Sequence, residues 1–228
     1  MREADLGFVF IIYATVIIMQ RFIRFILFCL LTSVGFASLA ATTMDTPASL
    51  YYPTVNTIVG NPAGKITIVE FFDYRCVYCR HIPAIIADLL KKNPDVRVVY
   101  RDYPLLGPPS ALAAEAALSA QQQGKYLQLH NALFTSKQPL DINVIKQLAA
   151  QQGIDAQKME KAHLSYLTQQ QLRENAQLAN KLDVDGIPTI FVALTPLSTQ
   201  RDTIEAYKLI SPSLADLQNA INLLKEPA

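Results

Sequence analysis

The first half of the chain alternates between apolar runs and segments with helical spacing. Residues 66–72 form an apolar run interrupted by Glu70, which predicts a central β-strand. The segment from Cys76 to about Lys92 has helical spacing, and residues 96–100 form a second apolar strand. A short edge strand is expected at residues 57–59. These elements predict a strand–helix–strand unit with Cys76 at the first strand–helix junction.

The helix after Cys76 has one apolar face. Its buried positions are expected to be Ile82, Ile85, Ile86, Leu89 and Leu90. Asn93 and Pro94 end the helix, because the residue before a proline disfavours helical backbone. Pro83 lies inside the expected helix and cannot donate a hydrogen bond to the carbonyl of Cys79. We therefore expect a kink at Pro83.

The residue composition and spacing of the sequence change after the second strand. From Ser110 to about Leu182, segments rich in Ala, Gln and Leu follow one another with helical spacing and predict four or five helices. Residues 190–194 then form a strand, 203–209 its hairpin partner and 216–225 a closing helix. The order predicts an α/β domain with an inserted all-helical subdomain at about residues 108–182.

The N-terminal forty residues have the pattern of an export signal. Arg21 and Arg24 precede a short apolar run that ends in small residues, with cleavage expected after Ala40. Met19 heads this pattern, so translation is expected to start there, and an uncleaved anchor is the alternative. Residues 41–55 are polar and turn-rich and are expected to form a flexible extension before a domain spanning 56–226.

Composition and charge narrow the class of protein. The 228 residues are 51% hydrophobic with a formal net charge of +1, which does not favour nucleic acid as a partner. The chain has three cysteines, and cleavage of the signal would remove Cys29. The exported protein would then hold only Cys76 and Cys79, too few for a disulfide-stapled scaffold.

The spacing of Cys76 and Cys79 favours redox chemistry over structure. A disulfide that closes a loop of about four residues stabilises a fold by only roughly 2 kcal/mol. At the start of a helix, unpaired N–H groups and the helix dipole favour a sulfur anion. Cys76 is therefore the expected nucleophile, and Cys79, deeper in the helix, is the expected resolving thiol.

Three features together resemble the DsbA family of periplasmic thiol:disulfide oxidoreductases. They are the Cys76–Cys79 motif after an apolar strand, Glu70 six positions earlier, and Gly-Ile-Pro-Thr at 186–189 before a late strand. The resemblance covers about residues 56–224 and implies a thioredoxin-like fold. It also implies a cis peptide bond before Pro188, facing the cysteines, with the backbone of Ile187 available to pair with an extended client.

The resemblance also implies a reaction cycle in the periplasm. Reduced or unfolded exported proteins would be the clients, and a membrane quinone-linked reoxidase of the DsbB type would restore the disulfide. No bound cofactor is implied. Val77 and Tyr78, between the cysteines, are expected to contact clients in an apolar rim with Tyr74 and the loop at 103–108; ordinary core packing of these aromatic residues is the equal alternative.

Glu70 is a candidate proton carrier. Alternation along its strand places Glu70 and Phe72 on one face and Val69 and Phe71 on the other. If the strand is central, both faces are covered, and burial raises the pKa of a carboxyl group. Glu70 would then exchange a proton with Cys79, as the resemblance also implies; an exposed or paired glutamate is the alternative.

Other functions remain open on the sequence. Tyr78 beside the second cysteine is closer to isomerase-type relatives, so a disulfide isomerase or reductase is the first alternative to an oxidase. A client-binding chaperone or metal carrier is the second. No metal site is expected, because Cys76, Cys79 and His81 lack a fourth ligand and His130 is isolated. The protein is expected to be a monomer or a small homodimer.

Overall fold

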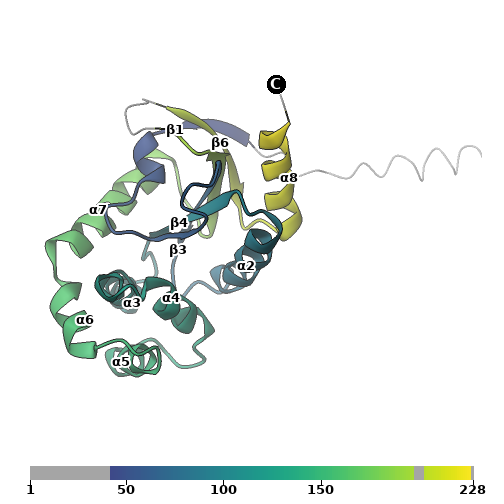
Figure 1. The fold of residues 1–228 in the computed structure, drawn as a ribbon. Helices are drawn as coiled ribbons and strands as arrows, with labels where there is room; N and C mark the ends of the chain where they lie inside the picture. The colour runs from purple at the N-terminus through teal and green to yellow at the C-terminus, as the bar shows by residue number, and fades with distance from the viewer. Residues whose placement is uncertain (1–41, 198–202, 227–228) are drawn as a thin grey trace, which may run out of the picture. The chain divides into compact units, whose positions relative to one another are not determined.

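The structure is a computed structural model that describes residues 42–197 and 203–226. The strands are β1 (Thr42–Thr46), β2 (Ile58–Gly60), β3 (Ile66–Phe72), β4 (Val96–Asp102), β5 (Thr189–Leu194) and β6 (Ile204–Ile210). The helices are α2 (Ile82–Lys92), α3 (Pro108–Ala120), α4 (Tyr126–Thr135), α5 (Ile142–Gln151), α6 (Ala156–His163), α7 (Tyr166–Lys181) and α8 (Leu214–Lys225) (Figure 1). Short 3-10 helices lie at Ala48–Tyr51 (η1), Cys79–His81 (η2) and Gln121–Gln123 (η3).

The predicted signal peptide, the start at Met19 and Cys29 lie outside the described residues. Within 42–197 and 203–226, no helix combines the length and apolarity needed to cross a bilayer.

The strands form one mixed sheet in the order β1-β6-β5-β3-β4-β2. β3 pairs in parallel with β4 and antiparallel with β5, and every residue of β3 is buried. This confirms the prediction that 66–72 is a central strand. β2 lies at one edge, as expected, and β5 and β6 form the expected antiparallel pair.

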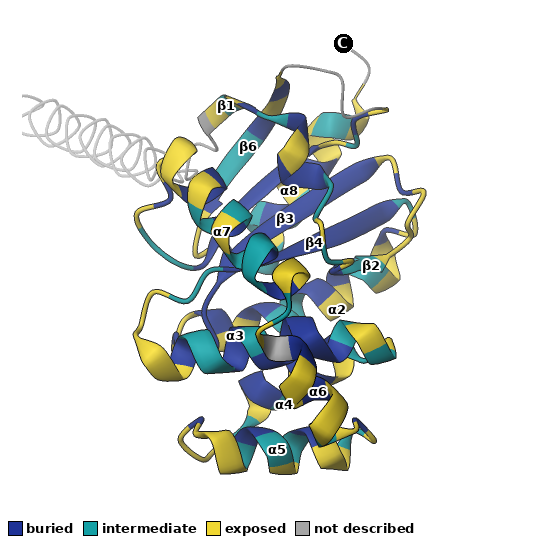
Figure 2. Ribbon diagram, turned by 90° about the vertical axis from the view of Figure 1, so that its left-hand side faces the viewer, coloured by how far each residue is buried: buried dark blue, intermediate teal, exposed yellow. Residues whose placement is uncertain are grey.

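The alternation of β3 divides the core into two clusters. Phe72 packs on one face with residues of α2, α3, α4 and α8, whereas Phe71 packs on the other with residues of α7 and η1. Figure 2 shows β3 and β4 buried along their lengths between these layers. Because both faces are covered, any polar side chain on β3 is removed from water.

The helical segment between β4 and β5 contains α3 to α7, and confirms the predicted block of four or five helices. These helices, apart from α7, gather away from β1 and β6 (Figures 1 and 2). α3 packs against α4, α5, α6 and α7, and its alanines allow close approach. Asp141, Asp155 and Ser165 accept backbone N–H groups at the starts of α5, α6 and α7.

The prediction of a flexible segment at residues 41–55 is wrong for its described part. β1 pairs with β6 along five residues, and Leu50 and Tyr51 of η1 are fully buried. The buried guanidinium of Arg101 donates hydrogen bonds to the carbonyls of Ser49 and Leu50. The segment is ordered by partners more than fifty residues away in sequence, which local polarity does not reveal.

Candidate active site

The turn that presents Cys76 is held by Asp73. The carbonyl of Asp73 accepts the N–H of Cys76 at 3.0 Å, and one carboxylate oxygen accepts the N–H of Arg75 at 2.7 Å. The other oxygen accepts the N–H of Leu106 at 2.9 Å. Asp73 therefore closes the turn after β3 and ties it to the loop that follows β4.

The two cysteines differ in access to solvent. Both are free thiols in this structure, with Cys76 6% exposed and Cys79 fully buried. The N–H of Cys79 donates to Sγ of Cys76 at 3.2 Å. The Cys76 sulfur is thus a hydrogen-bond acceptor for the backbone of the motif itself. Cys76 is the one residue of the pair with any exposed surface, so an approaching thiol would meet Cys76 before Cys79.

The helix after the cysteines begins later than predicted. Residues 79–81 form the 3-10 helix η2, and the α-helix α2 starts at Ile82, so Cys76 lies in the preceding turn. Pro83 is consequently in the first turn of α2 and not in its interior. First-turn N–H groups have no acceptor within a helix, and a proline costs little there. The predicted kink at Pro83 is therefore wrong.

The peptide bond between Ile187 and Pro188 is cis, as predicted. Thr189 closes this turn, because its hydroxyl donates to the carbonyl of Gly186 at 2.7 Å. The thiol of Cys76 lies 3.5 Å from the carbonyl oxygen of Ile187. The structure therefore brings two motifs that are more than a hundred residues apart to one site.

Glu70 lies on the β3 face that carries Phe72 and is fully buried, as predicted. Neither of its carboxyl oxygens has a hydrogen-bond partner among the described residues. Burial raises the pKa of Glu70 well above the usual glutamate value, and the charge of Asp102 raises it further. A neutral carboxylic acid is therefore the favoured form of Glu70 in the folded protein.

Burial is also the largest influence on Cys79. It raises the pKa of the Cys79 thiol far above the usual cysteine value, and a hydrogen bond with the Cys76 side chain acts in the same direction. The charge of Glu70 is a smaller contribution of the same sign. Cys79 thus needs a proton acceptor before it can act as a nucleophile, and Glu70 is close enough to interact with it electrostatically.

A buried polar cluster next to Glu70 was not predicted from the sequence. Asp102 is buried, and its carboxylate accepts the hydroxyl of Tyr126 at 2.9 Å. Burial raises the pKa of Asp102 to about 7. Nearby, the Tyr74 hydroxyl hydrogen-bonds with Nδ1 of His130 at 3.1 Å, and burial lowers the pKa of His130 to about 3. The only local signal was an acidic residue that ends an apolar strand.

Exposed apolar side chains surround the Cys76 turn. Val77 is 67% exposed and Tyr78 is 71% exposed, and Leu105 and Leu106 are also exposed. Tyr74, which the sequence placed in the same rim, is instead a core residue that packs on Phe72. His81 is exposed, and no three His, Cys, Asp or Glu side chains in the described ranges are grouped to hold a metal.

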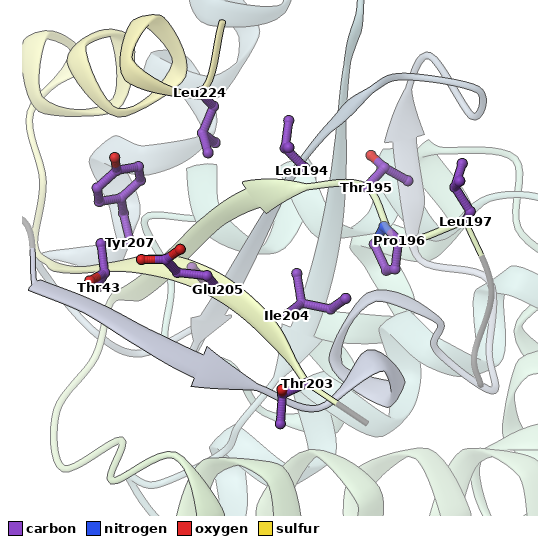
Figure 3. Close-up of a pocket in the computed structure, with 11 residues that line it drawn as sticks. Thr43, Leu194, Thr195, Pro196, Leu197, Thr203, Ile204, Glu205, Tyr207 and Leu224 are labelled. Carbon is purple, nitrogen blue, oxygen red and sulfur yellow. The ribbon is translucent and has the colours of Figure 1, made fainter. Parts of the chain in front are cut away.

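A hollow of about 430 Å³ lies elsewhere in the fold. Its lining comes from β1, β5, β6 and α8, with Leu194, Tyr207 and Leu224 among the residues in Figure 3. Leu194 ends the strand that Thr189 begins next to Pro188, so roughly 17 Å of extended chain separates the two sites. The hollow is lined by no residue of the cysteine turn.

Comparison with known proteins places this geometry in a family. Residues 54–210 match the family model described as thioredoxin. A thioredoxin-like oxidoreductase from Silicibacter pomeroyi is 32% identical with a TM-score of 0.68, and the match covers 79% of this chain and 98% of that one. The chain is a DsbA-like member of the thioredoxin superfamily. It is a thiol:disulfide oxidoreductase with a thioredoxin-like fold and a helical insertion.

A further relative supports the DsbA-like assignment, and a further solved structure supports the fold. The thiol:disulfide interchange protein DsbA of Bordetella parapertussis is 29% identical over 196 residues, covering 76% of this chain and 90% of that protein. The catalytic domain of Proteus mirabilis ScsC shares the fold with a TM-score of 0.65 at 24% identity, covering 78% of this chain and 94% of that one.

Proposed function

We propose that this DsbA-like protein is an exported dithiol oxidase that introduces disulfides into client proteins through Cys76 and Cys79. The observation that carries the proposal is the asymmetry of the pair: Cys76 is slightly exposed and lies beside the cis Ile187–Pro188 bond, whereas Cys79 is fully buried. Such an arrangement accepts a client on one sulfur only and reserves the other for release.

The reaction begins with the bridged form of the protein. A client thiolate attacks Sγ of Cys76, a new sulfur–sulfur bond forms, and the bond to Cys79 breaks. Cys79 leaves as a thiolate and takes a proton from Glu70, whose raised pKa keeps it protonated. A second client thiolate attacks the client sulfur of the mixed disulfide, and Cys76 leaves as a thiolate. Two electrons pass from the client thiols to the protein.

The reverse step uses the same proton path. The mixed disulfide can also be attacked by Cys79 in place of a second client thiolate. Cys79 must then lose its proton, and ionised Glu70 accepts that proton. Escape through Cys79 restores the bridge and releases the client reduced. Glu70 is thus proposed as the proton carrier in both directions, with Cys76 as the nucleophile and Cys79 as the resolving thiol.

Clients are proposed to bind along the exposed face of the turn. The backbone of Ile187 lies beside Cys76 and can pair with an extended client strand, while Val77 and Tyr78 contact its side chains. Pairing through backbone groups is independent of client sequence, which suits a protein with many substrates.

The cycle is proposed to run in the periplasm. Its support is the signal-like N-terminus and similarity to a periplasmic thioredoxin-like protein from Salmonella enterica, 25% identical with a TM-score of 0.61. A membrane quinone-linked reoxidase of the DsbB type would take the two electrons from reduced Cys76 and Cys79. The alternative is an isomerase or reductase kept in the dithiol form, which the Val77–Tyr78 dipeptide favours.

The redox state of the pair separates these functions. Thiol alkylation of the protein from its own compartment should find mostly bridged Cys76–Cys79, and equilibration with glutathione should give an oxidising potential. A mostly reduced pair would favour the isomerase or reductase. Cys76→Ser should abolish oxidation of a reduced client protein, and full activity of this variant would favour a chaperone. When the free Cys76 of a Cys79→Ser variant attacks a client disulfide and displaces one client thiolate, the mixed disulfide should accumulate, because no Cys79 thiol is present to resolve it.

A further inference from the structure

A second hollow, of about 350 Å³, opens directly beside the cysteine turn. Arg75 and Arg80, the residues flanking the Cys76–Cys79 motif, line one side. Pro109 at the start of α3 and Pro139–Leu140 in the loop before α5 contribute apolar walls. The hollow therefore lies where the residues next to a client cysteine would pass.

The side chains that line this hollow carry a net positive charge. Arg75 and Arg80 are exposed, and neither forms an ion pair with a carboxylate in the described part of the chain. The one carboxylate in the lining is Asp141, whose Oδ1 already accepts the N–H groups of the next helix, from Asn143 at 2.8 Å and Val144 at 2.9 Å. Two cations thus face one acid that is engaged in capping α5.

The position of Arg75 is partly fixed. Its guanidinium donates to the carbonyl of Leu106, in the loop that Asp73 also holds. A tethered guanidinium loses less side-chain entropy when it binds an anion, and it retains further N–H donors for a carboxylate. Arg80 is the less constrained member of the pair.

We propose that the hollow lined by Arg75 and Arg80 is a client subsite for the carboxylate of an aspartate or glutamate near the reacting cysteine. The inference rests on the proposed function and adds a substrate class to it. The subsite makes clients with an acidic residue near the cysteine react faster, because the ion pair forms as the client sulfur approaches Cys76.

The test uses matched pairs of reduced peptides with one cysteine. Each pair differs only by Glu or Gln at one to four residues from the cysteine, on either side. The rate of attack on the bridged full-length protein is divided by the rate of attack on a small neutral disulfide, which removes the effect of Glu on the peptide thiol itself. At one or more positions the Glu peptide should react about two- to fivefold faster, and salt should reduce the preference.

Variants test whether Arg75 and Arg80 cause the preference for the Glu peptide. Arg75→Gln with Arg80→Gln should bring the two peptides to equal normalised rates. Arg173→Gln, on the exposed surface of α7, removes the same charge elsewhere and should keep the preference. If the double variant slows both peptides equally and leaves their ratio unchanged, the arginines act on Cys76 alone and the subsite is refuted.

The outcomes also separate this inference from the proposed function. Exchange with both peptides at equal rates in the unmodified protein overturns the subsite and leaves the oxidase proposal standing. No exchange with either peptide overturns the oxidase proposal. A further arm compares glutathione with its diethyl ester; sensitivity there without any peptide preference would assign the hollow to a small thiol and overturn the client subsite.

Discussion

Two neighbouring carboxyl groups govern the proton chemistry beneath the cysteines. Glu70 and Phe72 on β3 are in register with Tyr100 and Asp102 on β4, so the two acids are diagonal neighbours on one face of the sheet. Burial favours the neutral form of each, and the charge of Asp102 raises the pKa of Glu70 further. An internal acid is thus available to Cys79, the thiol that solvent does not reach.

The first prediction concerns Glu70→Gln, which keeps the shape of the side chain and removes its ability to accept a proton. The attack of Cys79 on a mixed disulfide at Cys76, which releases the bound thiol, should slow on the order of 10²-fold, since Cys79 loses its general base. The measurement is the release of a coloured aromatic thiol from Cys76, which suits a chain without tryptophan. Glu205→Gln, an exposed position on β6, is the control. Equal release rates in all three proteins would exclude the relay.

The second prediction concerns Asp102→Asn, which can still accept the Tyr126 hydroxyl but carries no charge. The pKa of Glu70 should fall, because one cause of its elevation is removed, while burial keeps it above the usual value. Glu70 accepts a proton only when ionised, so thiol release should rise with pH through the pKa of Glu70. The midpoint of this pH profile should therefore move to lower pH in the variant. An unchanged midpoint would show that Asp102 does not act on Glu70.

At the scale of elements, β1 and η1 extend the sheet and cover one of its faces. Thr46 ends β1, and its hydroxyl donates to the carbonyl of Ile204 in β6 at 2.8 Å. It also hydrogen-bonds with the Tyr51 hydroxyl at 2.6 Å, and burial raises the pKa of Tyr51 to about 12. The Thr46 hydroxyl thus links β1 to both β6 and η1.

The third prediction is that Thr46→Val lowers the free energy of unfolding by about 1–3 kcal/mol. The variant keeps the side-chain volume but leaves the buried Tyr51 hydroxyl without its partner. Urea denaturation measures the change. Thr43→Val on the same strand is exposed and should stay within about 0.5 kcal/mol of the unmodified protein. Equal effects of the two substitutions would contradict the proposed role of Thr46.

At the scale of the whole molecule, buried titratable groups couple stability to pH with opposite signs. His130 is neutral in the folded protein, since burial lowers its pKa to about 3, and it is surrounded by Tyr74, Tyr100 and Tyr126. Asp102, with its pKa raised to about 7, contributes stability at low pH that is lost as pH rises toward 7. His130, with its lowered pKa, instead contributes stability at neutral pH that is lost as pH falls.

The fourth prediction follows from the depressed pKa of His130. Below about pH 6.5 the unfolded chain gains a proton at this residue and the folded protein does not, so stability falls by up to about 1.4 kcal/mol per pH unit. His130→Phe removes this loss. As pH falls, the free energy of unfolding of the unmodified protein should therefore decrease more than that of the variant. A difference independent of pH would contradict a buried neutral His130.

Much of the fold follows from local pattern. The apolar run at 66–72, the helical spacing of 110–182 and the late apolar run at 190–194 each predict an element that the structure contains. The place of Cys76 and Cys79 after the central strand was predicted from their spacing, whereas the cis bond before Pro188 was implied by the resemblance to the DsbA family. Hydrophobic periodicity and short motifs are properties of neighbouring residues, so the sequence by itself determines them.

Tertiary structure alone decided the partners of polar residues. The Asp102–Tyr126 and Tyr74–His130 contacts join β4, α4 and the cysteine turn, and in the sequence these side chains resemble surface residues. Arg75 and Arg80 likewise form a subsite only because α3 and the loop before α5 lie beside them. Polar side chains take their role from what surrounds them in space, because burial and distance set their charge state, and neither is visible along the chain.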